Sequence, residues 1–253
     1  MQYLKEFLNS KVEKYNCLEF IELDPISIPH KFTLKEDIEI AGFLAATIAW
    51  GNRKAILKSA NRLMQWMDNK PYDFIMNHSE SDIKPFGQFV YRTFNGDDCV
   101  FFIKSLQNIY QNYGGIHKVI KTGYLPNKSI KEAIHYFRGL FFLLPHQKRT
   151  EKHFANVEKG SAAKRLNMYL RWMVRNDKNG VDFGLWNQIG MADLMMPLDV
   201  HSGTIARKLG LLQRNSNDWK AVVELTAKLK QFDASDPVKY DYALFGLGVN
   251  NDF

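Results

Sequence analysis

The sequence has few cysteines and no long apolar run, and these absences exclude several classes of protein. The 253 residues include two cysteines, Cys17 and Cys99. Two cysteines cannot form the disulfide framework of a small secreted domain, nor supply four thiolates to a zinc site or an iron–sulfur cluster. No apolar run approaches the ~18 residues of a membrane span. Residues 1–6 lack the basic start and apolar core of a signal peptide, so we expect a cytoplasmic protein without a membrane partner.

The apolar residues that are present recur mainly at helical spacing. Hydrophobic residues make up 45% of the chain and aromatic residues 13%, so a large core can form. Residues 33–36 (TLKE) and 129–132 (SIKE) have the capping-box pattern that opens a helix. We find no repeat of roughly 20–50 residues and no convincing strand. The sequence therefore predicts an all-α fold of about ten helices, in a single bilobal domain around a central cleft, with the lobe boundaries left open.

Positive charge is concentrated in the segment from Pro145 to Arg175. This segment contains eight Lys and Arg residues against two Glu residues, so it carries +6 of the net charge of +7. A concentrated basic segment in an otherwise nearly neutral protein favours an anionic partner, with nucleic acid first and a phosphate-rich small molecule second. A solvated basic loop without a partner is the alternative that the charge alone leaves open.

An apolar run in residues 195–210 ends at Pro197, and an acid and a short amphipathic helix follow. Asp199 stands at the N-cap position, where backbone amides would hold its carboxylate. Gly210 stands where a helix commonly ends with a left-handed residue. The structural interpretation is that Asp199 only caps the helix. The functional interpretation is that the cap also fixes a carboxylate for catalysis.

Lys164 lies in the first turn of a helix that Ser161 is predicted to cap. The free amides and the dipole at a helix N-terminus disfavour an ammonium there by ~0.3–1 kcal/mol. Lys159, Arg165 and Arg171 add like charge, which favours the free amine further. A free amine is a nucleophile that can form a Schiff base. The alternative is a solvent-facing lysine that contacts a phosphate.

These features together resemble the helix-hairpin-helix superfamily of base-excision DNA glycosylases. Residues 197–201 (PLDVH) and 207–211 (RKLGL) are similar to the aspartate motif of that superfamily, and residues 240–248 (YDYALFGLG) resemble its closing helix. Residues 160–164 (GSAAK) are most similar to the archaeal 8-oxoguanine glycosylase-like branch. No Gly-Val-Gly or Gly-Pro-Gly hairpin precedes Asp199, so a DNA-anchoring hairpin would be present only in altered form. By this resemblance the chain is identified as a separate bacterial family within or beside the superfamily.

The resemblance implies a bifunctional DNA repair glycosylase with AP-lyase activity, which removes a damaged base, such as an oxidised purine, through a lysine Schiff base. Asp199 matches the essential aspartate of the superfamily, and Lys164 takes the place of its lysine. The partner would be duplex DNA with a flipped base, with no cofactor, no metal and no obligate protein partner. The residues expected to hold DNA are Lys148, Arg149, Lys152, Lys159, Arg165, His201 and Arg207. The residues expected to line the base pocket are Trp50, Asn52, Tyr91, Trp172 and Trp186.

Two other functions fit parts of the sequence. A helical DNA-binding module could keep the fold without the chemistry, and its affinity would then fall steeply with salt and survive the loss of Lys164 and Asp199. A metal hydrolase could use Asp199, His201 and His153, although two residues this close at a helix start do not face one centre. A short distance between the Lys164 amine and the Asp199 carboxylate would favour catalysis over both.

Overall fold

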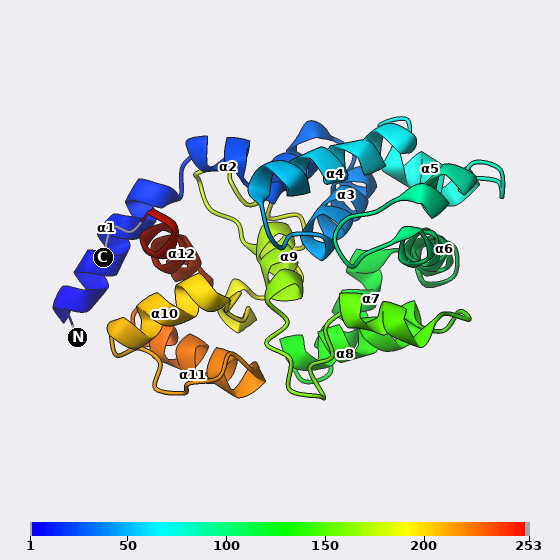
Figure 1. Ribbon diagram of the computed structural model, residues 1–253. Coiled ribbons are helices and arrows are strands. Elements are labelled where there is room, and N and C mark those ends of the chain that lie inside the picture. Colours follow the sequence, from blue (N-terminus) through cyan, green and yellow to red (C-terminus); the bar gives the residue numbers. More distant parts are fainter. Residues whose placement is uncertain (1, 251–253) are drawn as a thin grey trace. The chain divides into compact units, whose positions relative to one another are not determined.

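The computed structural model, which describes residues 2–250, is built from helices (Figure 1). These residues form twelve α-helices and no strand, and their extended pairings are two isolated bridges, Tyr91 with Phe94 and Ser161 with Asp218. The predicted all-α fold is confirmed. None of the helices in this part of the chain is long and apolar enough to cross a membrane.

The described residues divide into two compact units. We call residues 2–22 and 156–250 the terminal unit, and residues 23–155 the central unit. The terminal unit holds α1 (Gln2–Tyr15), α9 (Lys164–Val174), η5 (Met191–Asp193), α10 (Val200–Lys208), α11 (Trp219–Lys230), η6 (Pro237–Lys239) and α12 (Tyr240–Asn250). The central unit holds η1 (Pro25–Ser27), η2 (Pro29–Lys31), α3 (Lys35–Thr47), α4 (Arg53–Trp66), α5 (Pro71–Asn77), η3 (Lys84–Gln88), α6 (Gly96–Tyr113), α7 (Ile116–Tyr124), α8 (Ile130–Phe141) and η4 (Lys148–His153). The short helix α2 (Glu19–Leu23) lies where the chain passes from one unit into the other.

An aromatic cluster forms the core of the central unit. Phe43 on α3 contacts the rings of Phe102, Phe137, Phe141 and Phe154, with centroids 5.4 to 6.0 Å apart. The rings prefer tilted and edge-on arrangements because their quadrupoles repel in a face-to-face sandwich. This cluster joins α3, α6 and α8, which carry no residue of the predicted catalytic pair.

The two predicted capping boxes have different outcomes. Ser129 caps α8 as predicted, because its Oγ accepts a hydrogen bond from the amide of Glu132 at 3.2 Å. The box predicted at Thr33 is wrong: Leu34 is the N-cap of α3, and no side chain caps that helix. Every residue of α3 from Ile38 to Thr47 is buried, so tertiary packing rather than a cap stabilises the helix.

In the terminal unit, α12 packs against α1 and α10 (Figure 1). Two glycines permit the close approach. A Cβ on Gly246 would lie 2.3 Å from the Tyr15 ring, and one on Gly248 would lie 3.0 Å from the Cβ of His201. Because His201 lies in the first turn of α10, this packing brings α12 to the amino end of α10.

The helix that carries Lys164 starts later than predicted. Ala163, not Ser161, is the N-cap of α9, and Lys164 is the first helical residue. Ala163 has a φ of +50°, in the left-handed region that non-glycine residues rarely occupy. The Ser161 hydroxyl instead accepts a hydrogen bond from the Ala163 amide at 3.2 Å, within the preceding turn. A local side-chain contact thus replaced the expected cap.

Candidate functional site

Asp199 is the N-cap of α10, as predicted. Its Oδ1 accepts hydrogen bonds from the backbone amide of Ser202 at 2.9 Å and from the Ser202 hydroxyl at 3.1 Å. The Ser202 hydroxyl in turn accepts from the amide of Asp199 at 3.0 Å, which completes a capping box. These bonds fix the carboxyl group through Oδ1.

Lys164 faces the second oxygen of this carboxylate. The Lys164 Nζ lies 3.8 Å from Asp199 Oδ2, and the two side chains are 25% and 22% exposed. The distance is too long for a direct hydrogen bond but within ion-pair range. The structure therefore brings together the two residues that the sequence singled out, at a place that water and a ligand can reach.

The other neighbours of Lys164 are weakly polar. Its Nζ lies 3.4 Å from the Met168 sulfur, one helical turn further along α9. It also lies 5.9 Å from the centroid of the Phe245 ring on α12. Sulfur is a weak acceptor and an aromatic face attracts a cation only modestly, so Asp199 supplies the one full negative charge among these contacts.

Behind this pair lies a buried ionic network on the same face of α9. Arg171 donates to Asp182 from Nε, at 3.2 Å, and to Asp241 from Nη1. Arg175 donates to Asp182 at 3.0 Å and to Asp236 at 2.9 Å. Both arginine side chains are 3% exposed. Two of the eight bases of the basic segment are thus neutralised inside the terminal unit and contribute nothing to a binding surface.

Asp241 is the acid of this network that lies on α12, and its pKa is strongly displaced. Burial raises the pKa of Asp241 to about 6, and the negative charges of Asp199 and Asp182 raise it too. The positive charges of Arg171 and Lys164 act in the opposite direction. Sequence reasoning missed Asp241, although an acid in the otherwise apolar helix 240–248 is a signal that could have identified it.

The predicted DNA-binding residues of the terminal unit differ in how exposed they are and in whether they already bind other residues of the unit. Lys159 and His201 are exposed, and His201 lies two residues from Asp199. Arg165 is half-buried, and burial lowers the pKa of its guanidinium to about 10. Arg207 donates to the carbonyl of Arg214 at 2.8 Å and to Asn217 at 2.6 Å. Its guanidinium therefore already holds the loop that follows α10.

The remaining predicted DNA-binding residues belong to the central unit, because the unit boundary after Ala155 divides the basic segment. Lys152 is exposed, and Lys148 pairs with Glu151 at 3.2 Å. Arg149 has a structural role: it donates to Asp98 at 2.8 Å, to Asn95 at 2.9 Å and to the carbonyl of Thr93 at 2.9 Å.

Asp98 anchors η4 to the start of α6. Its buried carboxylate accepts from the Thr150 hydroxyl at 2.7 Å and lies 3.1 Å from His153 Nε2. Burial raises the pKa of Asp98, but hydrogen bonds from Asn95 and Thr150 and the nearby positive groups outweigh it and hold the pKa below its usual value. These contacts give the segment 148–153 a fixed place on the central unit.

The predicted base-pocket residues are also distributed over both units. Trp172 and Trp186, in the terminal unit, are 0% exposed and belong to its core. In the central unit, Tyr91 is buried and donates its hydroxyl to the carbonyl of half-buried Trp50. Asn52 is exposed and caps α4 by accepting from the amide of Ala55 at 3.1 Å. The two buried indoles offer no surface to a base in this structure.

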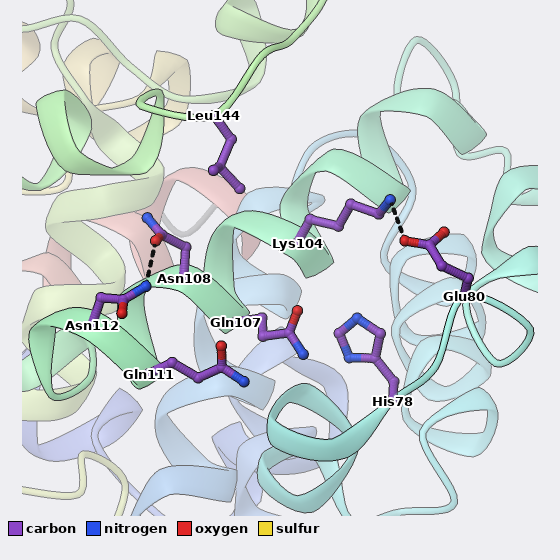
Figure 2. Close-up of a pocket in the computed structure, with 8 residues that line it drawn as sticks. All are labelled: His78, Glu80, Lys104, Gln107, Asn108, Gln111, Asn112 and Leu144. Atoms are coloured by element: carbon purple, nitrogen blue, oxygen red, sulfur yellow. Dashed lines mark hydrogen bonds and ion pairs between the residues drawn. The ribbon is translucent and has the colours of Figure 1, made fainter.

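A separate pocket of about 320 Å³ lies on the central unit and is lined by polar groups (Figure 2). Four amide side chains of α6 project from one stretch of the helix, and Lys104 pairs with Glu80 at 2.9 Å. The lining residues are His78, Glu80, Lys104, Gln107, Asn108, Gln111, Asn112 and Leu144. None of them was predicted to be functional. In the part of the chain that the structure describes, no group of three or more His, Cys, Asp or Glu residues is placed to hold a metal ion.

One family model matches residues 24–250, and its description is "Protein of unknown function (DUF2400)". Neither the curated proteins nor the solved structures gave a match. The expected membership of the helix-hairpin-helix glycosylase superfamily is therefore wrong, because the family that matches is a different one. The motifs behind that expectation are short. A capping acid before a helix and a glycine after it are common at helix ends in general.

Proposed function

The chain belongs to the DUF2400 family of proteins of unknown function, and we propose from its own residues that it is a DNA N-glycosylase with AP-lyase activity. In this proposal Lys164 is the nucleophile and Asp199 accepts its proton. The protein would then repair DNA that carries a damaged base.

The observation that supports this proposal is the 3.8 Å distance between Lys164 Nζ and Asp199 Oδ2. An ammonium has no lone pair, so Lys164 must lose a proton before it can attack carbon. A carboxylate within reach of the amine can accept that proton. The capping box holds Asp199 Oδ1, so the free oxygen keeps a fixed direction toward the lysine. Preorganised geometry of this kind is what lowers a reaction barrier.

The chemistry balances with these two residues and the substrate. Asp199 takes one proton from the Lys164 ammonium. The freed lone pair forms a bond to C1′ of the sugar, the C1′–N bond to the base breaks, and the base leaves with that electron pair and takes up the proton from Asp199. One further proton passes from the lysine nitrogen to the ring oxygen as the ring opens, which gives a protonated imine. Loss of a proton from C2′ then expels the 3′ phosphate, and water hydrolyses the imine to restore the amine. Asp199 is ionised again once the base has taken that proton, and it then offsets the positive charge of the imine.

Charge and accessibility support DNA as the substrate. The chain carries a net charge of +7. Exposed Lys159 and His201 lie in the same unit as the Lys164–Asp199 pair. Asp199 also marks the amino end of α10, where the helix dipole favours a phosphate, and Val200 beside it is 72% exposed. A backbone phosphate at this end would bring a sugar near the lysine.

Borohydride trapping on duplex DNA with one abasic site tests the proposal. The wild-type protein is expected to become covalently attached to the DNA, because borohydride reduces the imine to a stable amine. Lys164→Gln removes the nucleophile and should abolish trapping, while Asp199→Asn should slow it by about 10²-fold or more. Lys220→Gln is the matched control: it removes one exposed lysine of the same unit that is not among the residues expected to hold DNA, and it should still trap.

Two outcomes would contradict the proposal. If Lys164→Gln traps as well as wild type does, Lys164 is not the nucleophile. If wild type neither traps nor releases any base from DNA with oxidised, alkylated or deaminated bases, the protein is not a glycosylase. Salt-dependent DNA binding that survives both substitutions would then indicate a binding module without chemistry.

A further inference from the structure

We propose that the polar pocket beside α6 binds a neutral sugar of about the size of one pyranose ring, through the amide side chains of that helix. The pocket has a volume of about 320 Å³, and small-molecule sites typically begin at about 300 Å³. All of its lining residues belong to the central unit, whereas Lys164 and Asp199 belong to the terminal unit. The inference is therefore independent of the proposed glycosylase activity.

The first argument is the composition of the polar face of α6. The residues of this face that line the pocket recur three and four positions apart, and they are Lys104, Gln107, Asn108, Gln111 and Asn112. Exposed faces of helices are more often rich in Lys and Glu, which are good helix formers, whereas Asn is a poorer one. Four amides beside one charged residue give this face many hydrogen-bonding groups and little charge.

The second argument is that existing hydrogen bonds hold some of these amides and leave other groups for a ligand. Asn112 Nδ2 donates to Asn108 Oδ1 at 2.8 Å, and Gln111 Nε2 donates to the carbonyl of Met76 on α5 at 3.3 Å. Within residues 2–250, the side-chain amide of Gln107 has no hydrogen-bond partner. Each amide can both donate and accept, so the wall formed by α6 offers both kinds of group.

His78 supplies an acceptor on the other side of the pocket. Its Nδ1 lies 2.9 Å from the carbonyl oxygen of Phe74, and because a carbonyl only accepts, Nδ1 carries the hydrogen. In the neutral ring Nε2 is then an acceptor. The ring stacks on that of Phe74, with centroids 5.3 Å apart, which fixes its orientation. Figure 2 shows the side chains of His78 and Gln107 pointing toward each other, so a ligand between them would meet both.

The charges of the pocket favour a neutral ligand. Lys104 and Glu80 are the lining residues with a full charge, and Lys104 Nζ lies 2.9 Å from Glu80 Oε1. A phosphate or carboxylate would have to compete with Glu80 for this ammonium and would be repelled by the acid. A cationic ligand would meet the corresponding repulsion from Lys104. A neutral ligand leaves the ion pair in place.

A sugar ring fits both the polar and the apolar parts of the lining. Its hydroxyls each donate and accept, as the amides do, and its C–H groups can contact Leu144 and the His78 ring. A second cavity of about 520 Å³ shares Lys104 and Leu144 with the first and adds the side chains of Phe101 and Pro145, so there is room for a second sugar unit. Nucleobases are typically held by stacking on aromatic rings, and His78 has the one ring among the residues that line the first pocket.

Titration of the full-length protein with neutral sugars, followed by NMR of the side-chain amides, tests the proposal. The probes are glucose, galactose, mannose, N-acetylglucosamine, maltose and cellobiose, each raised to millimolar concentrations. At least one should shift the Gln107 and Asn108 amide signals in a saturable way and leave that of Gln65, exposed on α4 of the same unit, in place. Gln107→Leu should weaken the binding of that sugar by about 10-fold or more. Gln65→Leu is the matched control and should bind the sugar as wild type does.

Three results would overturn the proposal. The first is the absence of saturable shifts at Gln107 and Asn108 in wild type with every sugar, a measurement that needs no variant to fold. The second is saturable binding of adenosine or inorganic phosphate at these amides without binding of any sugar, which would assign the pocket to another class of ligand. The third is sugar binding that neither Gln107→Leu nor Asn108→Leu weakens. Trapping on abasic DNA is decided by Lys164, so its outcome and that of the sugar titration are separate.

Discussion

Arg175 and Asp182 form an ion pair that is almost closed to water. Arg175 Nη1 lies 3.0 Å from Asp182 Oδ2, and the side chains are 3% and 0% exposed. The second oxygen of Asp182 accepts from Arg171 at 3.2 Å, so one carboxylate bridges two guanidinium groups that also pair with Asp241 and Asp236. The loop that carries Asp182 is thereby tied to the helix that carries Lys164.

Replacing Asp182 with Asn should destabilise the terminal unit strongly. The variant keeps the shape of the side chain but leaves two buried arginines with less negative charge, and breaking a buried pair in this way typically costs about 3–5 kcal/mol. The free energy of unfolding in urea measures the effect. Glu13→Gln, which changes an exposed acid on α1 of the same unit, should stay within ~0.5 kcal/mol of wild type. Equal effects of the two substitutions would contradict the role of Asp182.

Substitutions of Asp199 should separate its structural role from its catalytic one. Asp199→Asn retains an oxygen that accepts from the Ser202 amide, so stability should change by only a few tenths of a kcal/mol. Asp199→Ala removes the cap and should lower the free energy of unfolding by about 1–2 kcal/mol. Both variants should lose at least about 10²-fold in the rate of trapping. Stability comes from urea denaturation and activity from single-turnover trapping, and an Asn variant with full activity would leave Asp199 as a cap alone.

Asp241 should make stability depend on pH. Its pKa is about 6 in the folded protein, against about 3.9 in an unfolded chain, so the folded state binds the proton more tightly. The resulting stability is fully present below about pH 4 and is lost as the pH rises through 6, by about 2–3 kcal/mol in total. Asp241→Asn cannot ionise, so its stability relative to wild type should increase over that range. Urea midpoints from about pH 4 to 7.5 test this, and a constant difference between the two proteins would refute it.

Two glycines of the central unit should respond oppositely to alanine. A Cβ on Gly96 would lie 1.8 Å from the backbone oxygen of Gly87, and backbone atoms cannot easily move aside. Gly96→Ala should therefore lower the free energy of unfolding by roughly 3 kcal/mol. Gly139 lies at an exposed position of α8, where an added Cβ would meet no atom within 4 Å, so Gly139→Ala should raise it by about 0.5–1 kcal/mol. Thermal unfolding of both variants provides the comparison, and destabilisation by both would contradict the steric argument.

Two of the predicted helix caps, which depend only on neighbouring residues, could be read from the sequence, whereas those at Thr33 and Ser161 could not. The caps formed by Asp199 and Ser129 each involve an amide three residues away, and both are present as expected. Lys164 and Asp199 were singled out by their places at two helix starts, and the structure places them 3.8 Å apart. Their catalytic roles remain a proposal.

Features that depend on distant partners could not be predicted. Arg171 and Arg175 were counted as surface charge, but their partners Asp241 and Asp236 lie 70 and 61 residues away along the chain. Trp172 was expected to line a pocket but is a core residue. Aromatic side chains occur in both places, so the residue type alone does not distinguish them. The left-handed backbone of Ala163 carries no sequence signal, because that conformation normally selects glycine or asparagine.

The cationic side chains on one face of α9 differ in how much of each is exposed to water. Lys164 at its start is 25% exposed, whereas Arg171 farther along the helix and Arg175, the residue that follows the helix, are each 3% exposed. Arg171 and Arg175 are compensated by buried carboxylates, and their ion pairs hold the surrounding segments together. Solvent reaches the Lys164 side chain, and the buried ion pair of Arg171 on the same helix fixes the position of the helix. One helix face thus carries an accessible amine, and buried ion pairs of the same helix fix its position.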